Sequence, residues 1–353
     1  MKNVTVLSTA CGAIFMPGFF KCLKMNNERK IRIIGVDCKE DVAAQYIVDA
    51  FYRVPPYTSS SYVKTLLEIC KEEKVDILFP QISMELPIIA ENINLFREIG
   101  VQVAITNPET INFSNSKLKL YEIMKSAGIC TPQYYAINSV EDLMAGAKKL
   151  GYPNEPVCVK VTQSSGSRGV RIIKNKISKA EMFVQEKPNS LFITMKDMCD
   201  ILNEMQEYPE MIVMKYLPGC EYTVDLLADH GEVLYMAGRK NTDSIASIAM
   251  KSFVEKRETA YEMCKNIVKL LELDGNIGFD FMLDENEMPV LTDLNPRITA
   301  TIILFLAAGI NFPYLRVKQL LGEPLPEIEI EYGVQLVRKY EDMLISSSGK
   351  IDA

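Results

Sequence analysis

Residues 278–301, GFDFMLDENEMPVLTDLNPRITAT, form the stretch that decides how the rest of the chain is interpreted. Two short apolar runs, 278–283 and 288–294, flank the polar turn DENE, and this pattern predicts a β-hairpin. A four-residue loop would pair Leu283 with Met288. We take this pairing as the starting hypothesis for the arrangement of the side chains.

Side chains point alternately to the two faces of a strand, so this pairing gives the hairpin a polar face and a core face. The polar face carries Asp280, Asp293 and Asn295. The core face carries Phe279, Phe281, Val290 and Leu294. Converging oxygen ligands suit Mg²⁺, which also bridges to substrate phosphates. Arg297 follows two residues later, and its planar guanidinium is suited to a phosphoryl oxygen. An acidic hairpin that faces solvent is the alternative.

The overall composition excludes several functional classes. A net charge of -7 gives no electrostatic footprint for nucleic acid, and no apolar run reaches the roughly 18 residues that a membrane span needs. A single histidine leaves little for zinc sites or histidine-based triads. Nine scattered cysteines without a C-x-x-C pair predict free thiols in a reducing, cytoplasmic environment.

The N-terminal third alternates between apolar strand patterns and helical patterns. We predict strands at 3–9, 31–37, 76–80 and 102–106, and helices at 18–25, 61–73 and 86–98. This alternation predicts a Rossmann-like parallel sheet with helices on both faces. The loop after the first strand, ACGAIFMPG, lacks the G-x-G-x-x-G pattern, so a dehydrogenase that binds NAD is the weaker interpretation.

The sequence then changes character. After a polar connector at 107–116, we predict helices at 117–127, 141–150, 195–206, 258–271, 299–308 and 315–321. The predicted strands are 156–161, 170–173, 211–217, 221–228, 234–238 and 333–340. A Gly/Ser loop at 164–169 joins two of these strands, and small residues of this kind let backbone N–H groups approach phosphates. We expect a small-residue loop up to Ala249. Strand 221–228 is expected to have one polar face and one core face, and a polar face that merely faces solvent is the alternative.

The order of these features resembles the ATP-grasp superfamily. A strand lysine, a Gly/Ser flap, a strand–turn with Gly-x-Glu and a carboxylate hairpin ending in D-x-N-P-R follow one another along residues 1–340. The nearest likeness is to the large subunit of carbamoyl-phosphate synthase and to related single-unit ligases. The resemblance implies a pre-ATP-grasp α/β domain (1–112), a small subdomain with the lysine strand and flap (113–210), a large subdomain with the metal hairpin (211–345) and a disordered tail (346–353).

The resemblance also implies roles for individual residues. Lys117 and Lys160 match the cations that contact the nucleotide phosphates, although Ser116 stands where the family usually has Asp. The flap is matched by Ser165, Gly166, Ser167, Gly169 and Val170. The adenine linker is matched by Met214, Lys215, Tyr216 and Leu217, with Met214 in the place of a common Glu. Glu221 matches the ribose ligand, and the Mg²⁺ ligands are Asp280, Asp293 and Asn295. Arg297 matches the arginine that steadies the transferred phosphoryl group, and Arg239 a basic residue near the substrate.

The implied activity is ATP- and Mg²⁺-dependent ligation, with Mn²⁺ as a substitute metal. A carboxylate would be phosphorylated to an acyl phosphate and coupled to an amine, both being small molecules. The alternatives are a nucleotide sensor without turnover, and a partial carbamoyl-phosphate synthase that acts as a dimer. A C-terminal apolar helix is compatible with a homodimer.

Overall fold

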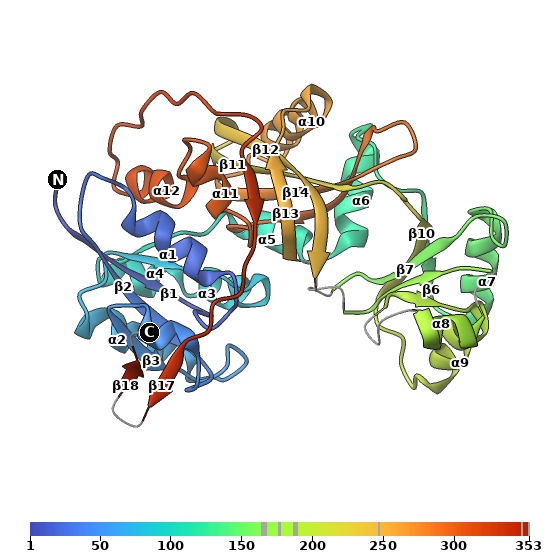
Figure 1. Ribbon diagram of the computed structural model, residues 1–353, viewed down its shortest axis with the longest axis horizontal. Helices are drawn as coiled ribbons and strands as arrows, with labels where there is room; N and C mark the ends of the chain where they lie inside the picture. Colours follow the sequence, from blue (N-terminus) through green and yellow to red (C-terminus); the bar gives the residue numbers. More distant parts are fainter. Residues whose placement is uncertain (164–167, 176–177, 186–189, 246–247, 347–348, 352–353) are drawn as a thin grey trace. The chain divides into compact units, whose positions relative to one another are not determined.

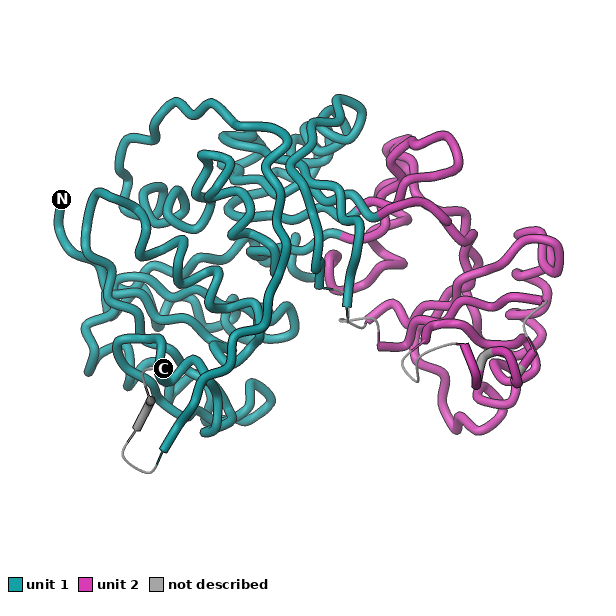
Figure 2. Tube along the Cα trace, in the orientation of Figure 1, with its two compact units in different colours: residues 1–112, 221–280, 294–353 teal, residues 113–220, 281–293 magenta. Residues whose placement is uncertain are grey.

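The computed structural model describes residues 1–163, 168–175, 178–185, 190–245, 248–346 and 349–351 (Figure 1). The chain divides into two compact units (Figure 2). Unit 1 comprises residues 1–112, 221–280 and 294–353, and unit 2 comprises residues 113–220 and 281–293. The three-part division expected from the sequence stays a prediction.

A five-stranded parallel sheet forms the N-terminal part of unit 1. Its order is β3 (Ala50–Arg53), β2 (Ile31–Asp37), β1 (Val4–Ser8), β4 (Ile77–Phe79) and β5 (Gln102–Val103). The predicted parallel sheet is confirmed, and β3 is a strand that the sequence pattern did not predict. The helices are α1 (Met16–Lys24), α2 (Tyr62–Glu72), α3 (Leu86–Glu91), α4 (Ile93–Glu98) and α5 (Pro108–Ser114). The connector expected at 107–116 is therefore helical in its centre.

Both faces of this sheet are covered, as alternation along the strands requires. Val6 belongs to a core that also contains Phe19, Leu227 and Phe305, whereas the next residue, Leu7, belongs to a core with helix α2. The first core joins the N-terminal sheet to residues far along the chain. This shared core explains why residues 1–112 and the C-terminal segments form one unit.

A second sheet in the structure has the order β15-β14-β11-β12-β13-β16. Its strands are β11 (Glu221–Asp229), β12 (Glu232–Ile245), β13 (Ile248–Val254), β14 (Gly275–Leu283), β15 (Pro289–Asn295) and β16 (Gln335–Val337). The expected loop up to Ala249 is wrong, because β12 continues to Ile245 and pairs on one side with β11 and on the other with β13. Beyond Asn241 the polar end of β12 pairs with β13, whose backbone supplies hydrogen bonds without the need for an apolar pattern.

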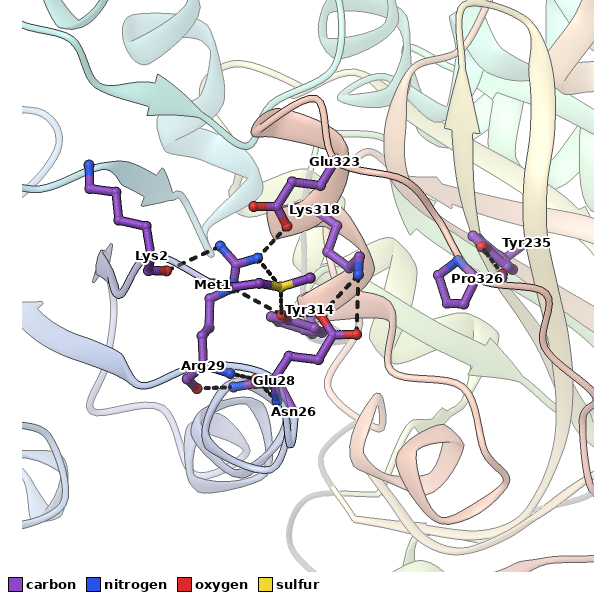
Figure 3. A network of polar contacts seen from close by, with 10 residues as sticks. All are labelled: Met1, Lys2, Asn26, Glu28, Arg29, Tyr235, Tyr314, Lys318, Glu323 and Pro326. Atoms are coloured by element: carbon purple, nitrogen blue, oxygen red, sulfur yellow. Dashed lines mark hydrogen bonds and ion pairs between the residues drawn. The ribbon is translucent and has the colours of Figure 1, made fainter.

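Helices α10 (Glu258–Leu270), α11 (Ile303–Ala307) and α12 (Phe312–Leu320) complete unit 1. Helix α12 packs against α1, and a polar network joins the two regions (Figure 3). Glu28 accepts hydrogen bonds from the Tyr314 hydroxyl at 2.7 Å and from the Lys318 ammonium at 2.9 Å. The Arg29 guanidinium donates to the same hydroxyl at 3.0 Å and pairs with Glu323.

Unit 2 is built on a sheet of order β6-β10-β7-β8-β9. The strands are β6 (Tyr134–Ile137), β7 (Val157–Val161), β8 (Val170–Ile173), β9 (Phe192–Ile193) and β10 (Met211–Lys215). The helices are α6 (Lys117–Ser126), α7 (Val140–Lys149), α8 (Lys179–Gln185) and α9 (Met195–Glu204). Leu143, Val159 and Val213 lie in its core, which fixes the sheet that carries Lys160.

The C-terminal tail differs from the disorder expected for 346–353. Strand β17 (Leu344–Ser346) pairs with β18 (Gly349–Ile351) in the described part of the tail. Across the described ranges, helices with the length and apolar character needed to cross a membrane are absent.

Candidate functional site

The hairpin of β14 and β15 closes differently from the starting hypothesis. Asp284 N–H donates to the carbonyl of Met288 at 3.0 Å, so the loop has one residue fewer than expected. The Asp284 carboxylate also accepts the N–H groups of Asn286 and Met288, at 2.8 and 2.9 Å. Glu287 adopts a left-handed conformation with φ 61°. The assumed pairing of Leu283 with Met288 is therefore wrong.

Burial nevertheless separates the two sets of hairpin side chains. All four residues assigned to the core face are buried: Phe279, Phe281, Val290 and Leu294. The three assigned to the polar face are half-buried: Asp280, Asp293 and Asn295. Within unit 1, the Asn295 amide donates to Asp280 Oδ2 at 2.8 Å, and the Thr223 hydroxyl donates to Asp280 Oδ1 at 2.9 Å. The Asp280 carboxylate is thus held by neighbours on both sides.

Arg297 lies beside Asn295, the amide partner of Asp280, in unit 1. Its Nη1 donates to the Ile298 carbonyl at 2.8 Å, and its Nη2 lies 3.4 Å from Asn295 Oδ1. Its Nε donates to the hydroxyl of Ser83 at 3.0 Å. These contacts hold the guanidinium plane next to Asn295.

The polar face of β11 is largely buried, so the alternative of a face that merely faces solvent is wrong. Thr223 and Asp225 are 0% and 2% exposed, and they lie beside Arg239 and Asn241 of β12. Glu221 pairs in register with Asn241, whose amide donates to the Glu221 carboxylate at 2.7 Å. The buried polar face therefore orients Glu221, the predicted ribose ligand.

Arg239 is also buried, and its guanidinium is held by two side chains. Nη1 donates to Asn241 Oδ1 at 2.6 Å, and Nε lies 3.5 Å from Asp225 Oδ2. Burial raises the pKa of the Asp225 carboxyl, and the charge of Arg239 opposes that shift. Burial and the nearby charge of Arg239 lower the pKa of Arg338.

These contacts join into one polar network in unit 1. The network runs through Asp225, Arg239, Asn241, Glu221, Thr223, Asp280, Asn295, Arg297 and Ser83. The predicted ribose ligand, two predicted metal ligands and both predicted arginines belong to it. A connected network of this kind fixes each side chain through its neighbours.

Unit 2 brings together two other predicted residues. The Lys117 ammonium lies 3.0 Å from the Asp293 carboxylate. Lys117 begins helix α6, and Ser116 caps that helix by accepting the N–H of Lys119 at 3.3 Å. The Ser116 hydroxyl also donates to the Glu210 carboxylate at 2.8 Å. Ser116 thus has a structural role at the position where an aspartate was expected.

Lys160 lies on β7 and pairs in register with Val170 of β8. Gly169 has φ +66°, and a Cβ there would lie 2.6 Å from a methyl carbon of Val161, so the turn requires glycine. The remaining flap residues in the prediction, Ser165, Gly166 and Ser167, lie outside the described residues.

The predicted adenine linker spans the end of β10, with Met214 and Lys215 inside the strand. Met214 is buried, 3% exposed, and Leu217 is 7% exposed. The N–H of Lys215 donates to the Gln133 carbonyl at 2.9 Å, so this residue would recognise a base through its carbonyl. Burial raises the pKa of the Tyr216 hydroxyl. Met214 lies opposite Tyr134 of β6 and Cys158 of β7 in the sheet of unit 2.

Two polar groups outside the network have local roles. The Asp37 carboxylate accepts the N–H groups of Gly12 and Lys39, at 2.9 and 3.0 Å. The ligand atoms of Asp229, His230 and Asp274 lie within 4.8 Å of one another, but Asp274 forms an ion pair with Arg316 at 3.2 Å. Neither group adds a site.

Sequence reasoning missed Ser83, Thr223, Asp225 and Asn241. The polar residues Glu221, Thr223 and Asp225 alternate with apolar ones along the first strand. Arg239 and Asn241 show the same spacing in the strand that follows the next chain turn. Two polar-alternating strands joined by a tight turn would have indicated a paired polar face. Ser83 carries no comparable signal, because it lies 214 positions from its partner Arg297.

Comparison with known protein families gives two matches. A family described as "ATP-grasp in the biosynthetic pathway with Ter operon" matches residues 207–342, and a family described as "PylC-like, N-terminal domain" matches residues 16–104. The carbamoyl phosphate synthase large chain of Clostridium acetobutylicum is 25% identical over 291 residues. The match covers 79% of this chain and 25% of that relative, so the chain spans about a quarter of its length.

Solved structures share the fold. The biotin carboxylase domain of the Hydrogenobacter thermophilus 2-oxoglutarate carboxylase, solved with MgADP, ADP and bicarbonate, is 16% identical with a TM-score of 0.68 over 94% of this chain and 73% of that one. The L-amino acid ligase of Bacillus licheniformis is 14% identical with a TM-score of 0.61 over 91% of this chain and 74% of that one. Residues 207–342 therefore resemble an ATP-grasp family, and the chain resembles the carbamoyl phosphate synthase large chain. The solved structures show that the chain shares their fold.

Proposed function

We propose that this protein is an ATP- and Mg²⁺-dependent ligase that phosphorylates a carboxylate and couples the resulting acyl phosphate to an amine. The observation that carries the proposal is the network in unit 1 that holds Glu221, Asp280, Asn295 and Arg297 together. These groups complement a ribose, a divalent cation and a phosphoryl group. The ligase and carboxylase names of the similar proteins support the same class.

The residues present fit Mg²⁺. Asp280, Asp293 and Asn295 offer carboxylate and amide oxygens, and a carboxylate keeps lone pairs for a metal while it accepts a hydrogen bond. Bound there, the metal would neutralise charge on the phosphates. Lys117 and Lys160 of unit 2 carry the positive charge that phosphate oxygens need. Phosphoryl transfer depends mainly on positioning and charge neutralisation, which such residues provide.

The proposed reaction has two steps. A carboxylate oxygen of the substrate attacks the γ-phosphorus of ATP, the bond to the bridging oxygen breaks, and ADP leaves. The amine nitrogen then attacks the acyl carbon, the bond to phosphate breaks, and the amine proton passes to the departing phosphate. Arg297 would hold the phosphoryl oxygens, and buried Arg239 would face the substrate. No protein nucleophile is required.

The test is release of ADP and phosphate with a panel of carboxylates and amines that includes bicarbonate with ammonia. Release that depends on both a carboxylate and an amine supports the ligase. Carbamoyl phosphate formed only from bicarbonate and ammonia would support the partial synthase. Nucleotide binding without ADP release across the panel would support the sensor.

The identity of the substrates, the homodimer and the cytoplasmic location belong to the same proposal. All nine cysteines are free thiols, which suits a reducing compartment. Light scattering of the purified chain, with and without Mg²⁺ and ATP, would measure the oligomeric state.

A further inference from the structure

The hydrogen bond between Arg297 and Ser83 connects the N-terminal sheet to the polar network. Ser83 follows β4 and begins a short 3₁₀ turn, Ser83–Glu85. Its hydroxyl accepts the Arg297 Nε–H at 3.0 Å. The other contacts described above for this guanidinium go to Asn295 and Ile298, which are neighbours in sequence. Ser83 therefore ties the arginine to a different part of unit 1.

The loop that carries Ser83 is fixed by a buried carboxylate. Glu85 is 0% exposed, and it accepts the N–H groups of Gln81 and Ile82 at 2.8 and 2.9 Å. It also accepts the Thr9 hydroxyl at 2.6 Å and the hydroxyl of Tyr62. These bonds anchor the loop to the end of β1 and to helix α2. Ser83 thus lies on a rigid support.

The loop also occupies a special place in the parallel sheet. In the order β3-β2-β1-β4-β5, the strand order reverses between β1 and β4. Thr9 follows β1 and Gln81 follows β4, and Gln81 N–H donates to the Thr9 hydroxyl at 2.9 Å. The carboxyl ends of the strands at such a reversal are where open α/β sheets bind ligands.

We infer that Ser83 is a positioning residue for Arg297, held in place by the Glu85-anchored loop. The inference rests on the proposed function, because it concerns the arginine that would hold the transferred phosphoryl group. A hydrogen bond at Nε fixes the rotation of the guanidinium plane and so the direction of the Nη groups. Small errors in the placement of such a group reduce the rate of a step that depends on alignment.

The experiment compares Ser83→Ala with Ser83→Thr, which keeps the hydroxyl, and with Ser60→Ala as the matched control on an exposed turn. In the substrate-dependent release assay, Ser83→Ala is expected to lower kcat about tenfold while KM for ATP stays within about twofold. Ser83→Thr should recover most of the loss, and Ser60→Ala should behave as wild type.

A double-mutant cycle tests whether Ser83 acts through Arg297. In an Arg297→Lys background, Ser83→Ala should cost nothing further, because the Nε–H that it orients is gone. Full additivity of the two losses would overturn the inference. So would a Ser83→Ala protein with unchanged kcat.

A second measurement does not require turnover. The Nε–H resonance of Arg297, identified by its loss in Arg297→Lys, should exchange with solvent at least about tenfold more slowly in wild type than in Ser83→Ala. Equal exchange rates would overturn the inference even in a protein that ligates its substrates. A different outcome is that wild type releases no ADP with any substrate pair but the exchange rates still differ. That result would overturn the proposed function and leave the positioning role of Ser83 intact.

Discussion

Lys117 and Asp293 form an ion pair of 3.0 Å in unit 2, joining the start of helix α6 to the end of the acidic hairpin. The pair links a predicted phosphate-binding cation to a predicted metal ligand. Each charge neutralises the other in the structure described here. A metal and a triphosphate would be expected to divide the pair, with the carboxylate turning to the metal and the ammonium to a phosphate.

Asp293→Asn tests this assignment. We expect a loss of ~100-fold in metal-dependent ADP release, because the amide keeps the shape of the side chain but loses the charge that binds Mg²⁺. Thermal unfolding should change little. Glu285→Gln, in the exposed loop of the same hairpin, is the matched control and should retain full activity. Normal turnover by Asp293→Asn would show that the hairpin is not the metal site.

Lys160→Ala tests the strand lysine of unit 2. We expect the Kd for a non-hydrolysable ATP analogue with Mg²⁺ to rise about tenfold, as for the loss of one hydrogen bond to a charged group. Titration calorimetry measures this directly. Lys148→Ala, on the exposed end of helix α7, serves as the control and should bind as wild type. An unchanged affinity in Lys160→Ala would remove this lysine from the nucleotide site.

Much of the fold followed from apolar periodicity. The strand Ile31–Asp37 has the bounds predicted from its sequence, because a buried parallel strand must be apolar on both faces. Helix α5 was missed because its start, Asn107–Pro108, resembles a polar connector. Asn107 accepts the Thr110 N–H at 2.7 Å and caps the helix, and Pro108 opens it without losing a hydrogen bond. Short helices are fixed by such caps more than by periodicity.

The candidate site was only partly predictable, for a different reason. The lysine, the acids of the hairpin and the arginine could be predicted, because they occur in a recognisable order along the sequence. Their partners are set by strand register and by contacts across the fold: Thr223 lies 57 positions from Asp280, and Ser83 lies 214 positions from Arg297. A single sequence carries no signal for such pairings unless two strands show matching alternation.

Asp225→Asn should destabilise unit 1. Both Asp225 and Arg239 are almost fully buried, and the substitution leaves the guanidinium without its counter-charge. Breaking one side of a buried ion pair costs about 3 kcal/mol in the free energy of unfolding. Urea unfolding measures the loss, and Asp229→Asn, at the exposed end of the same strand, is the control. Equal stability of the two variants would show that Arg239 does not depend on Asp225.

The hydrogen bonds of the Glu28 carboxylate predict how the stability of the fold depends on pH. Hydrogen bonds from Tyr314, and then from Lys318, lower the pKa of the Glu28 carboxyl below its ordinary 4.5. The folded protein therefore binds a proton at Glu28 less readily than the unfolded chain does. The contribution to stability is fully present above the unfolded pKa, and it is lost as the pH falls through the lower, folded-state value.

Glu28→Gln should consequently be less stable than wild type at pH 7, and the difference should shrink as the pH falls below 4.5, the ordinary pKa of this carboxyl. Urea unfolding at a series of pH values gives the difference directly. Glu98→Gln, exposed on helix α4, controls for the loss of a negative charge as such. The difference in stability between wild type and Glu28→Gln could instead stay constant with pH. The network of Figure 3 would then not act through the ionised carboxylate, and its role would be packing between α1 and α12.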